Sequence, residues 1–159
     1  MKPLGSEEAT PRTRGLVSRA TKLSTVPDRR AVLSAADSPR TFWSAPDEAT
    51  VVGSGSATTI RADGPDRCRV VREAATELFS VGDVHAGALA ARPRLFGGFA
   101  FHDEHTETAP WEGYPGAKFV LPRTQVTYAG GEAWLTVNDI GTDPEAVERR
   151  LEETVDRFE

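Results

Sequence analysis

The chain has 159 residues, of which 38% are hydrophobic and 27% are charged, a composition typical of one globular domain and not of a disordered chain. No apolar run approaches the roughly 18 residues needed to span a membrane, the N-terminus has no secretory signal pattern, and the single cysteine, Cys68, excludes an internal disulfide framework. These features predict a cytoplasmic protein. The net charge is -5, and the basic residues of the first 40 positions are scattered without aromatic neighbours, which disfavours nucleic-acid binding.

The first 60 residues predict a disordered lead-in and then short elements. Residues 1–14 are polar with two prolines and are expected to be disordered. Pro27 stands at a plausible first helical position and predicts a short helix over 27–36. Weak alternation predicts a strand over 15–24, and β-branched and aromatic residues predict strands over 40–44 and 49–61, with a turn over 45–48.

The stretch Gly53-Ser54-Gly55-Ser56 follows two valines and raises the possibility of a phosphate-binding loop. A dinucleotide fingerprint needs a third glycine, and here Thr58 stands in that place, followed by strand-forming residues instead of a helix. A P-loop needs a lysine, and none occurs between Lys22 and Lys118. The glycines are therefore expected to permit a bulge or a close approach between strands.

Residues 63–80 predict an amphipathic helix with Pro65 at its first position. Its apolar stripe is Cys68, Val71, Ala75, Leu78 and Phe79, which predicts that Cys68 is a small buried hydrophobe and not a reactive thiol.

The second half is rich in predicted strands. Residues 94–101 predict a strand containing two glycines, and 118–140 predict a hairpin that turns at Gly130-Gly131. A last helix begins near Pro144, with Thr142 or Asp143 as its cap. Its apolar stripe (Val147, Leu151, Val155 and Phe158) needs a surface to lie on, and we expect the chain to be one part of a larger architecture.

Few residues suggest chemistry. The run His102-Asp103-Glu104-His105 invites a metal interpretation, but its spacing is not that of a zinc protease helix, and we expect a solvated loop. His85 is expected to be a surface or half-buried histidine. No nucleophile motif occurs, and Trp43, Trp111 and Trp134 are expected to pack in the core or at strand edges. We assign no catalytic, cofactor-binding or metal-binding residue.

Four segments in order resemble the chorismate-utilising enzymes. They are LVSRATKL near the start, FWSAPDEATVVGSGSAT, RLFGGFAFHDE and PWEGYPGAKFVLPRTQV. The closest resemblance is to menaquinone-type isochorismate synthases, with the haloarchaeal branch as the nearest. The resemblance implies an α+β fold with a mostly antiparallel sheet and covering helices, and it places residues 15–159 as the N-terminal domain of such an enzyme.

In that family, water adds at C2 of chorismate while the C4 hydroxyl leaves. The resemblance implies a lysine base, a glutamate acid and glutamates that hold Mg²⁺, all in a C-terminal chorismate-binding domain that this chain lacks. Lys118 and Glu112 match structural segments of the family and take no catalytic role. The expected partner is therefore that C-terminal domain, in cis or as a separate chain, with no nucleic acid, no membrane and no cofactor in this chain.

Three interpretations stay open at this point. The chain is the scaffolding N-terminal portion of an isochorismate synthase-like enzyme and inactive alone, or a subunit that docks on a separately encoded chorismate-binding half, or an independent small-molecule binding module.

Overall fold

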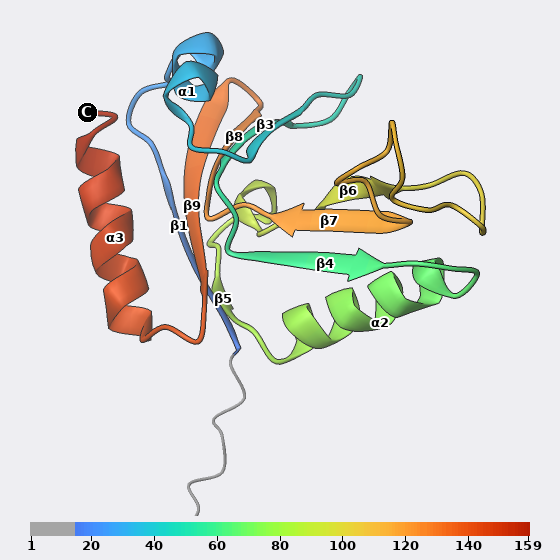
Figure 1. The fold of residues 1–159 in the computed structure, drawn as a ribbon. Coiled ribbons are helices and arrows are strands. Elements are labelled where there is room, and N and C mark those ends of the chain that lie inside the picture. The colour runs from blue at the N-terminus through green and yellow to red at the C-terminus, as the bar shows by residue number, and fades with distance from the viewer. Residues whose placement is uncertain (1–14) are drawn as a thin grey trace, which may run out of the picture.

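The computed structural model describes residues 15–159, so the predicted lead-in over 1–14 lies outside the described residues. This part of the chain forms two sheets that meet along one side, with three α-helices on their outer faces (Figure 1). The elements in chain order are β1 (Leu16–Lys22), α1 (Arg29–Ala35), β2 (Arg40–Trp43), β3 (Thr50–Ser54), β4 (Thr58–Ala62), α2 (Arg67–Ser80), β5 (Asp83–His85), the 3-10 helix η1 (Leu89–Ala91), β6 (Phe96–Phe99), β7 (Ala117–Leu121), β8 (Thr124–Ala129), β9 (Glu132–Ile140) and α3 (Pro144–Asp156).

The larger sheet has six strands in the order β2-β3-β8-β9-β1-β5, and only the β1–β5 pair is parallel. Strands alternate their side chains between two faces. On one face, Val126, Ala133 and Leu135 form the main core beneath α1 and the end of α3. Val137 and Val17 continue this core beneath Val147 of α3. The expected α+β class with mostly antiparallel strands is confirmed.

The opposite face of the larger sheet carries a strip of polar side chains instead. Ser18, Gln125, Thr127, Thr136 and Asn138 are each fully buried. Of these, Gln125 and Thr136 hydrogen-bond to the backbone of the segment that contains η1, which packs on β8 and β9. This segment covers the sheet through hydrogen bonds as well as through apolar contact, as described below.

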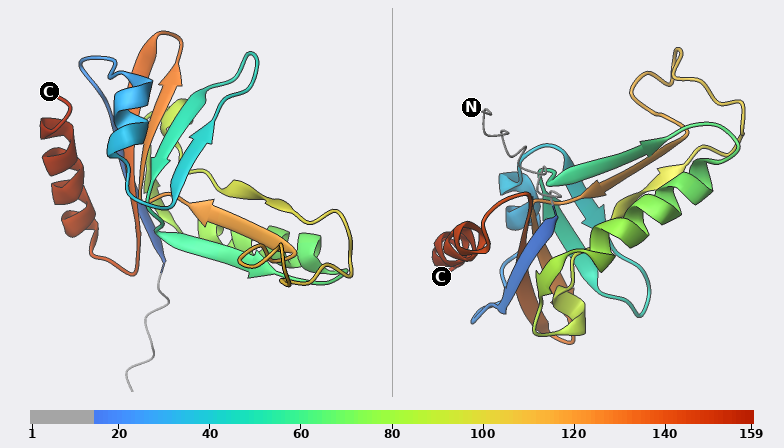
Figure 2. Two further views of the ribbon diagram at one scale, coloured as in Figure 1. Left: turned by 45° about the horizontal axis from the view of Figure 1, so that its top comes forward. Right: turned by 90° about the horizontal axis from the view of Figure 1, so that it is seen from below.

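The smaller sheet has three strands in the order β4-β7-β6, and it projects to one side of the larger sheet (Figures 1 and 2). Helix α2 packs on β4 and β7, where Val71 meets Ala62 and Ala117. Strand β6 lies beyond the helix as an edge strand. This arrangement leaves β6 and the loop after it with more exposed apolar surface than the rest of the small sheet.

Two predicted strands are each divided between the sheets, which corrects the sequence interpretation. The single strand predicted over 49–61 is β3 in the larger sheet and β4 in the smaller one, and Gly55, at φ 66°, makes the change of direction. Within the predicted hairpin over 118–140, β7 belongs to the smaller sheet, and only β8 and β9 form the hairpin. Local sequence favours strand on both sides of each break, so only the pairing partners reveal the division.

The helix starts differ from prediction by two residues in both places where a proline was taken as the first helical residue but precedes the helix. Asp28 caps α1 by accepting a hydrogen bond from the Ala31 N–H, and α2 begins at Arg67, so Pro27 and Pro65 both precede their helices. The start of α3 at Pro144 is confirmed, and Asp143 stands at the N-cap position, although its side chain makes no capping hydrogen bond. The apolar stripe of α3 lies on β1 and β9, so the described residues themselves supply the surface that this stripe was expected to need.

Candidate functional site

The residues singled out for possible metal binding lie in the exposed loop over 100–116 and make structural contacts. His102 Nδ1 accepts a hydrogen bond from the Glu104 N–H at 3.1 Å, and His105 Nε2 lies 2.7 Å from the Tyr114 carbonyl oxygen. The Asp103 carboxylate pairs with Arg67. The expected solvated loop is therefore confirmed, and these contacts give the loop a defined shape.

Arg67 anchors this loop to the start of α2. Its side chain is only 7% exposed and donates to the Gly64 carbonyl at 3.0 Å, to the Ala100 carbonyl at 2.7 Å and to Asp103 Oδ1 at 2.5 Å. Asp63 supports the other end of the loop by accepting a hydrogen bond from the Gly116 N–H at 2.7 Å. One end of the 100–116 loop is thus tied to the first residue of α2 and the other end to Asp63, which precedes this helix.

Cys68 is exposed, which corrects the prediction that it is buried. The neighbouring residue Arg67 occupies the buried position instead. Both residues precede Val71 by one helical turn, so the apolar periodicity allowed either to face the sheet. The three acceptors around the Arg67 guanidinium decide which one does.

His85 lies on β5 with its side chain 69% exposed, and its Nε2 is 3.0 Å from Asp83 Oδ1. Asp83 also accepts from the buried Arg19, which reaches Glu148 of α3 as well. The hydrogen bond from Arg19 holds the pKa of the Asp83 carboxyl below its ordinary value. This cluster joins β1, β5 and α3, and sequence analysis missed it because its members are far apart in the chain.

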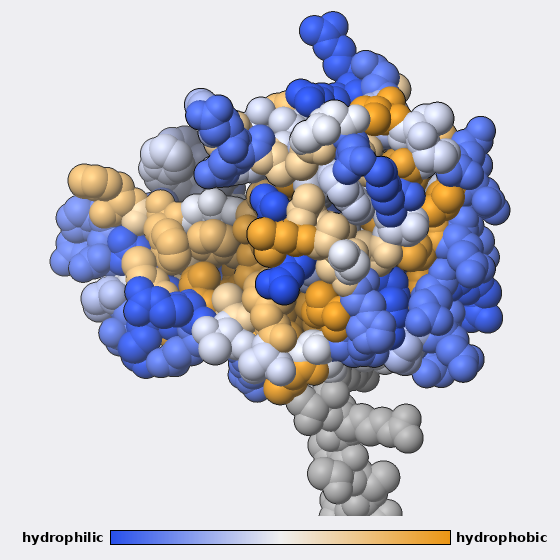
Figure 3. Space-filling model, turned by 180° about the vertical axis from the view of Figure 1, so that it is seen from behind, coloured by the Kyte–Doolittle hydropathy of each residue, from blue (hydrophilic) through white to orange (hydrophobic). Residues whose placement is uncertain are grey.

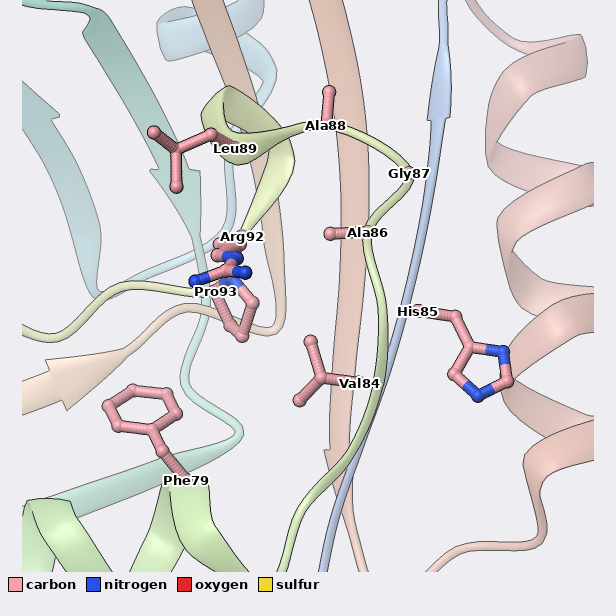
Figure 4. A pocket seen from close by; sticks show the side chains of 9 residues that line it. All are labelled: Phe79, Val84, His85, Ala86, Gly87, Ala88, Leu89, Arg92 and Pro93. Carbon is pink, nitrogen blue, oxygen red and sulfur yellow. The ribbon is translucent and has the colours of Figure 1, made fainter.

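A cavity of about 940 Å³ opens between the end of α2 and the segment that follows β5 (Figure 4). Phe79, Val84, Leu89 and Pro93 form apolar walls, and Arg92 extends between them, whereas His85 points away toward α3. Within residues 15–159, no carboxylate pairs with Arg92.

The wall of this cavity is held by the buried polar strip of the larger sheet. Gln125 donates to the Arg92 carbonyl at 3.0 Å and accepts from the Arg94 N–H at 3.4 Å. Thr136 donates to the Ala91 carbonyl at 2.7 Å. A segment without regular strand pairing is thus fixed in place by side chains that satisfy its backbone groups.

A surface rich in exposed aromatic side chains lies at β6 and the 100–116 loop. Phe99, Phe101, Trp111 and Tyr114 are 46%, 103%, 55% and 65% exposed, and we call these four residues the aromatic surface. They line a second cavity, of about 580 Å³, together with Gly98, His105 and Lys118. Figure 3, which views the molecule from behind, shows apolar side chains gathered over the small sheet and toward the larger one. Concentrated exposed apolar area of this kind marks an interaction site.

The tryptophans agree with the predicted edge packing only in part. Trp43 is 47% exposed and packs against Phe96 at 6.4 Å between ring centroids, where the edge strand β2 approaches the small sheet. Trp134 on β9 is partly buried, whereas Trp111 belongs to the aromatic surface. Trp43 and Phe96 extend the apolar area from the aromatic surface toward the larger sheet.

A family model described as chorismate binding enzyme matches residues 5–159. The chain belongs to the chorismate binding enzyme family. A search of curated proteins found no match.

Among solved structures, the chain is similar to MenF, the menaquinone-specific isochorismate synthase from Escherichia coli. The two share 18% sequence identity with a TM-score of 0.52, and the match covers 94% of this chain but 30% of MenF. At this identity the match shows only that this chain and the matched part of MenF share a fold. The chain therefore spans less than one third of the length of the solved enzyme that it resembles.

The residues of this chorismate-binding family member do not fit the Mg²⁺ that the resemblance implies for full-length enzymes. Within residues 15–159, no three His, Cys, Asp or Glu side chains gather in a way that could hold a metal ion. Several carboxylates here are instead paired with arginines, as Asp103 is with Arg67 and Asp83 with Arg19.

In the same part of the chain, no helix is both long and apolar enough to span a bilayer.

Proposed function

We propose that this chain is the N-terminal portion of an isochorismate synthase-like enzyme and serves as the scaffold on which a chorismate-binding part packs. The observation that carries the proposal is the family match over residues 5–159 combined with coverage of only 30% of MenF. Most of that similar enzyme has no counterpart in this chain. We expect the residues that bind and convert chorismate to belong to the other part.

The aromatic surface supports a scaffolding role. Its side chains are far more exposed than those of the core, and the rigid contacts of Arg67 and Asp63 hold their loop in one arrangement. A preorganised apolar surface loses little conformational freedom when a partner covers it. The chain would contribute shape and buried area to the enzyme, while the lysine base and the glutamate acid expected of the family act elsewhere.

The scaffold would act on the reaction indirectly. Isochorismate formation moves a hydroxyl from C4 to C2 of the ring, so a water and a leaving hydroxyl must be held on a substrate with two carboxylates. Small displacements of catalytic groups cost large factors in rate. We expect this chain to fix the position of the elements that carry those groups, in the cytoplasm, where an exposed thiol such as Cys68 stays reduced.

The test is conversion of chorismate in the presence of Mg²⁺, followed by separation of isochorismate from chorismate. We expect no product from this chain alone, and product when the chorismate-binding part encoded in the same genome is added or joined to it. Isochorismate formed by this chain alone would show that catalysis is located here and would refute the proposal.

One observation favours a separately encoded subunit as the second candidate. The described residues form their own core, in which α3 covers β1 and β9, so this chain is able to fold before it meets a partner. Purification of a stable complex between two separate chains would support this subunit. A continuous reading frame through both parts would support a single enzyme.

A further inference from the structure

The described residues contain four strands at sheet edges, and β6 differs from the other three. The edge strands of the larger sheet carry charges, Arg40 in β2 and Asp83 in β5, and β4 of the smaller sheet carries Arg61. Charged side chains at an edge oppose pairing with another strand. Strand β6 has the sequence Phe-Gly-Gly-Phe, with neither a charge nor a proline.

The free edge of β6 can be assigned to particular backbone groups. Phe96 and Gly98 lie opposite Val120 and Lys118 of β7, and the same register continues to Ala100, whose N–H donates to the Gly116 carbonyl at 2.7 Å. Hydrogen bonding alternates along an antiparallel pair. Phe96, Gly98 and Ala100 therefore bond toward β7, and the N–H and C=O groups of Gly97 and Phe99 point out from the sheet.

The two glycines of β6 have different structural reasons. A Cβ on Gly97 would collide with the Lys118 carbonyl and would lie 2.7 Å from the Phe119 Cα, so this position requires glycine. A Cβ on Gly98 would meet nothing within 4 Å, and its φ is not in the left-handed region. A glycine inside a strand costs about 0.5–1 kcal/mol relative to alanine. No contact within this chain requires a glycine at position 98. A close approach by another molecule would explain why glycine is found there.

We propose that β6 accepts an added strand from the chorismate-binding part, paired through the outward groups of Gly97 and Phe99 and covered by the aromatic surface. This inference rests on the proposed function, because it specifies where the scaffold would contact the chorismate-binding part. The 580 Å³ cavity flanks this edge. Gly98 forms its floor, and its walls are aromatic, from Phe101, Trp111 and Tyr114. Backbone pairing supplies the affinity of such a contact, and the flanking pockets supply its specificity.

The partner is expected to be the chorismate-binding part and not a second copy of this chain. MenF has most of its length outside the match, so a similar enzyme has chain available to supply the strand. Two copies of this chain would each bring a net charge of -5, and like net charges oppose association.

The experiment measures binding of this chain to the separately produced chorismate-binding part from the same genome by calorimetry. Proline at position 99 removes an outward N–H and leaves the bonds to β7 intact. Phe99→Ala is the matched control, because it removes the same ring but keeps the N–H; this ring packs at a tilt against Phe119, with 5.0 Å between the ring centroids. We expect Phe99→Pro to weaken binding at least tenfold beyond Phe99→Ala, and Gly98→Ala to weaken it without lowering the melting temperature of the free chain.

Amide hydrogen exchange of the wild-type complex tests the geometry without any substitution. The Gly97 and Phe99 amides should gain protection, while those of Phe96 and Gly98, already bonded to β7, should change little. Equal binding by Phe99→Pro and Phe99→Ala, together with unchanged exchange at Gly97 and Phe99, would overturn the inference and leave the proposed function intact. If the wild-type chain does not bind the chorismate-binding part at all, the proposed function fails as well. Concentration-dependent dimerisation of the free chain that protects the same two amides would identify a second copy as the occupant instead.

Discussion

Replacing the adjacent glycines of β6 by alanine, one at a time, should change the stability of the free chain in opposite directions. Both substitutions reduce the conformational freedom of the unfolded chain to the same extent, worth about 0.5–1 kcal/mol in favour of folding. They differ in the space that the new methyl group meets. At Gly98 nothing lies within 4 Å of it, so the entropic gain should remain and Gly98→Ala should be slightly more stable than the wild type.

At Gly97 the methyl group would overlap the backbone of Lys118 and Phe119. Overpacking in a close-packed region costs about 1–3 kcal/mol. Backbone atoms cannot rotate away, so we take the upper end of that range, which leaves a net loss of about 2 kcal/mol after the entropic gain.

The assay is thermal unfolding followed by circular dichroism, with urea unfolding to obtain free energies. For a domain of this size, 1 kcal/mol shifts the melting temperature by about 2–4 °C, so the two variants should differ by about 6–12 °C. A Gly97→Ala variant as stable as Gly98→Ala would show that β6 and β7 do not approach as closely as described. A clear loss of stability in Gly98→Ala would refute the argument that this glycine serves a contact outside the chain.

Three further results are expected. Arg67→Ala should lower the free energy of unfolding by about 2–4 kcal/mol, because a buried side chain loses three hydrogen bonds, one of them to Asp103. The fluorescence of Trp111 in the anchored loop should change as well. A loss below about 0.5 kcal/mol would contradict the anchoring role. Gln125→Leu should cost about 1–3 kcal/mol in urea unfolding and speed amide exchange over 91–94, and unchanged exchange there would show that this side chain does not hold the segment. Because Arg19 lowers the pKa of Asp83, the stabilisation from this pair is present above about pH 4 and is lost as the pH falls through the lowered pKa. Asp83→Asn should therefore make the free energy of unfolding less dependent on pH in this acid range. Identical pH profiles for the variant and the wild type would refute the coupling.

Several elements were predictable from sequence because their signals are local. The turn at Gly130-Gly131 has both residues at positive φ, at 58° and 78°, as a two-residue hairpin turn requires. The start of α3 follows from Asp143 and Pro144, and its stripe of apolar residues faces the core as the helical period demands. The close approach between strands that the sequence predicted for Gly53 is confirmed, since a Cβ at this position would lie within 3 Å of Pro122 and Thr41.

The candidate site was predictable only in its family, not in its geometry. The segments around FGGFAF and the loop after it suggested the chorismate-utilising enzymes. No local pattern indicates which edge of a sheet these residues form, or which of the two glycines has open space where a side chain would lie. The anchoring by Arg67 joins residues more than 30 positions apart, and the Arg19 cluster joins residues more than 60 apart. Such contacts depend on strand pairing and leave no trace in a window of neighbouring residues.

The sequence by itself determined the α+β class, most strand and helix segments, the turn chemistry and the family resemblance, because propensity, periodicity and capping act over a few residues. Only the tertiary structure decided that 49–61 is divided between two sheets, that Arg67 and not Cys68 is buried, and that β6 is an uncharged free edge beside exposed aromatic residues. The physical reason is that residues far away in the chain decide which sheet a strand joins and which side chains are buried. A segment with strand propensity can pair equally well in either sheet. A helix residue one turn from the core is buried only where the structure supplies hydrogen-bond acceptors or space for its side chain.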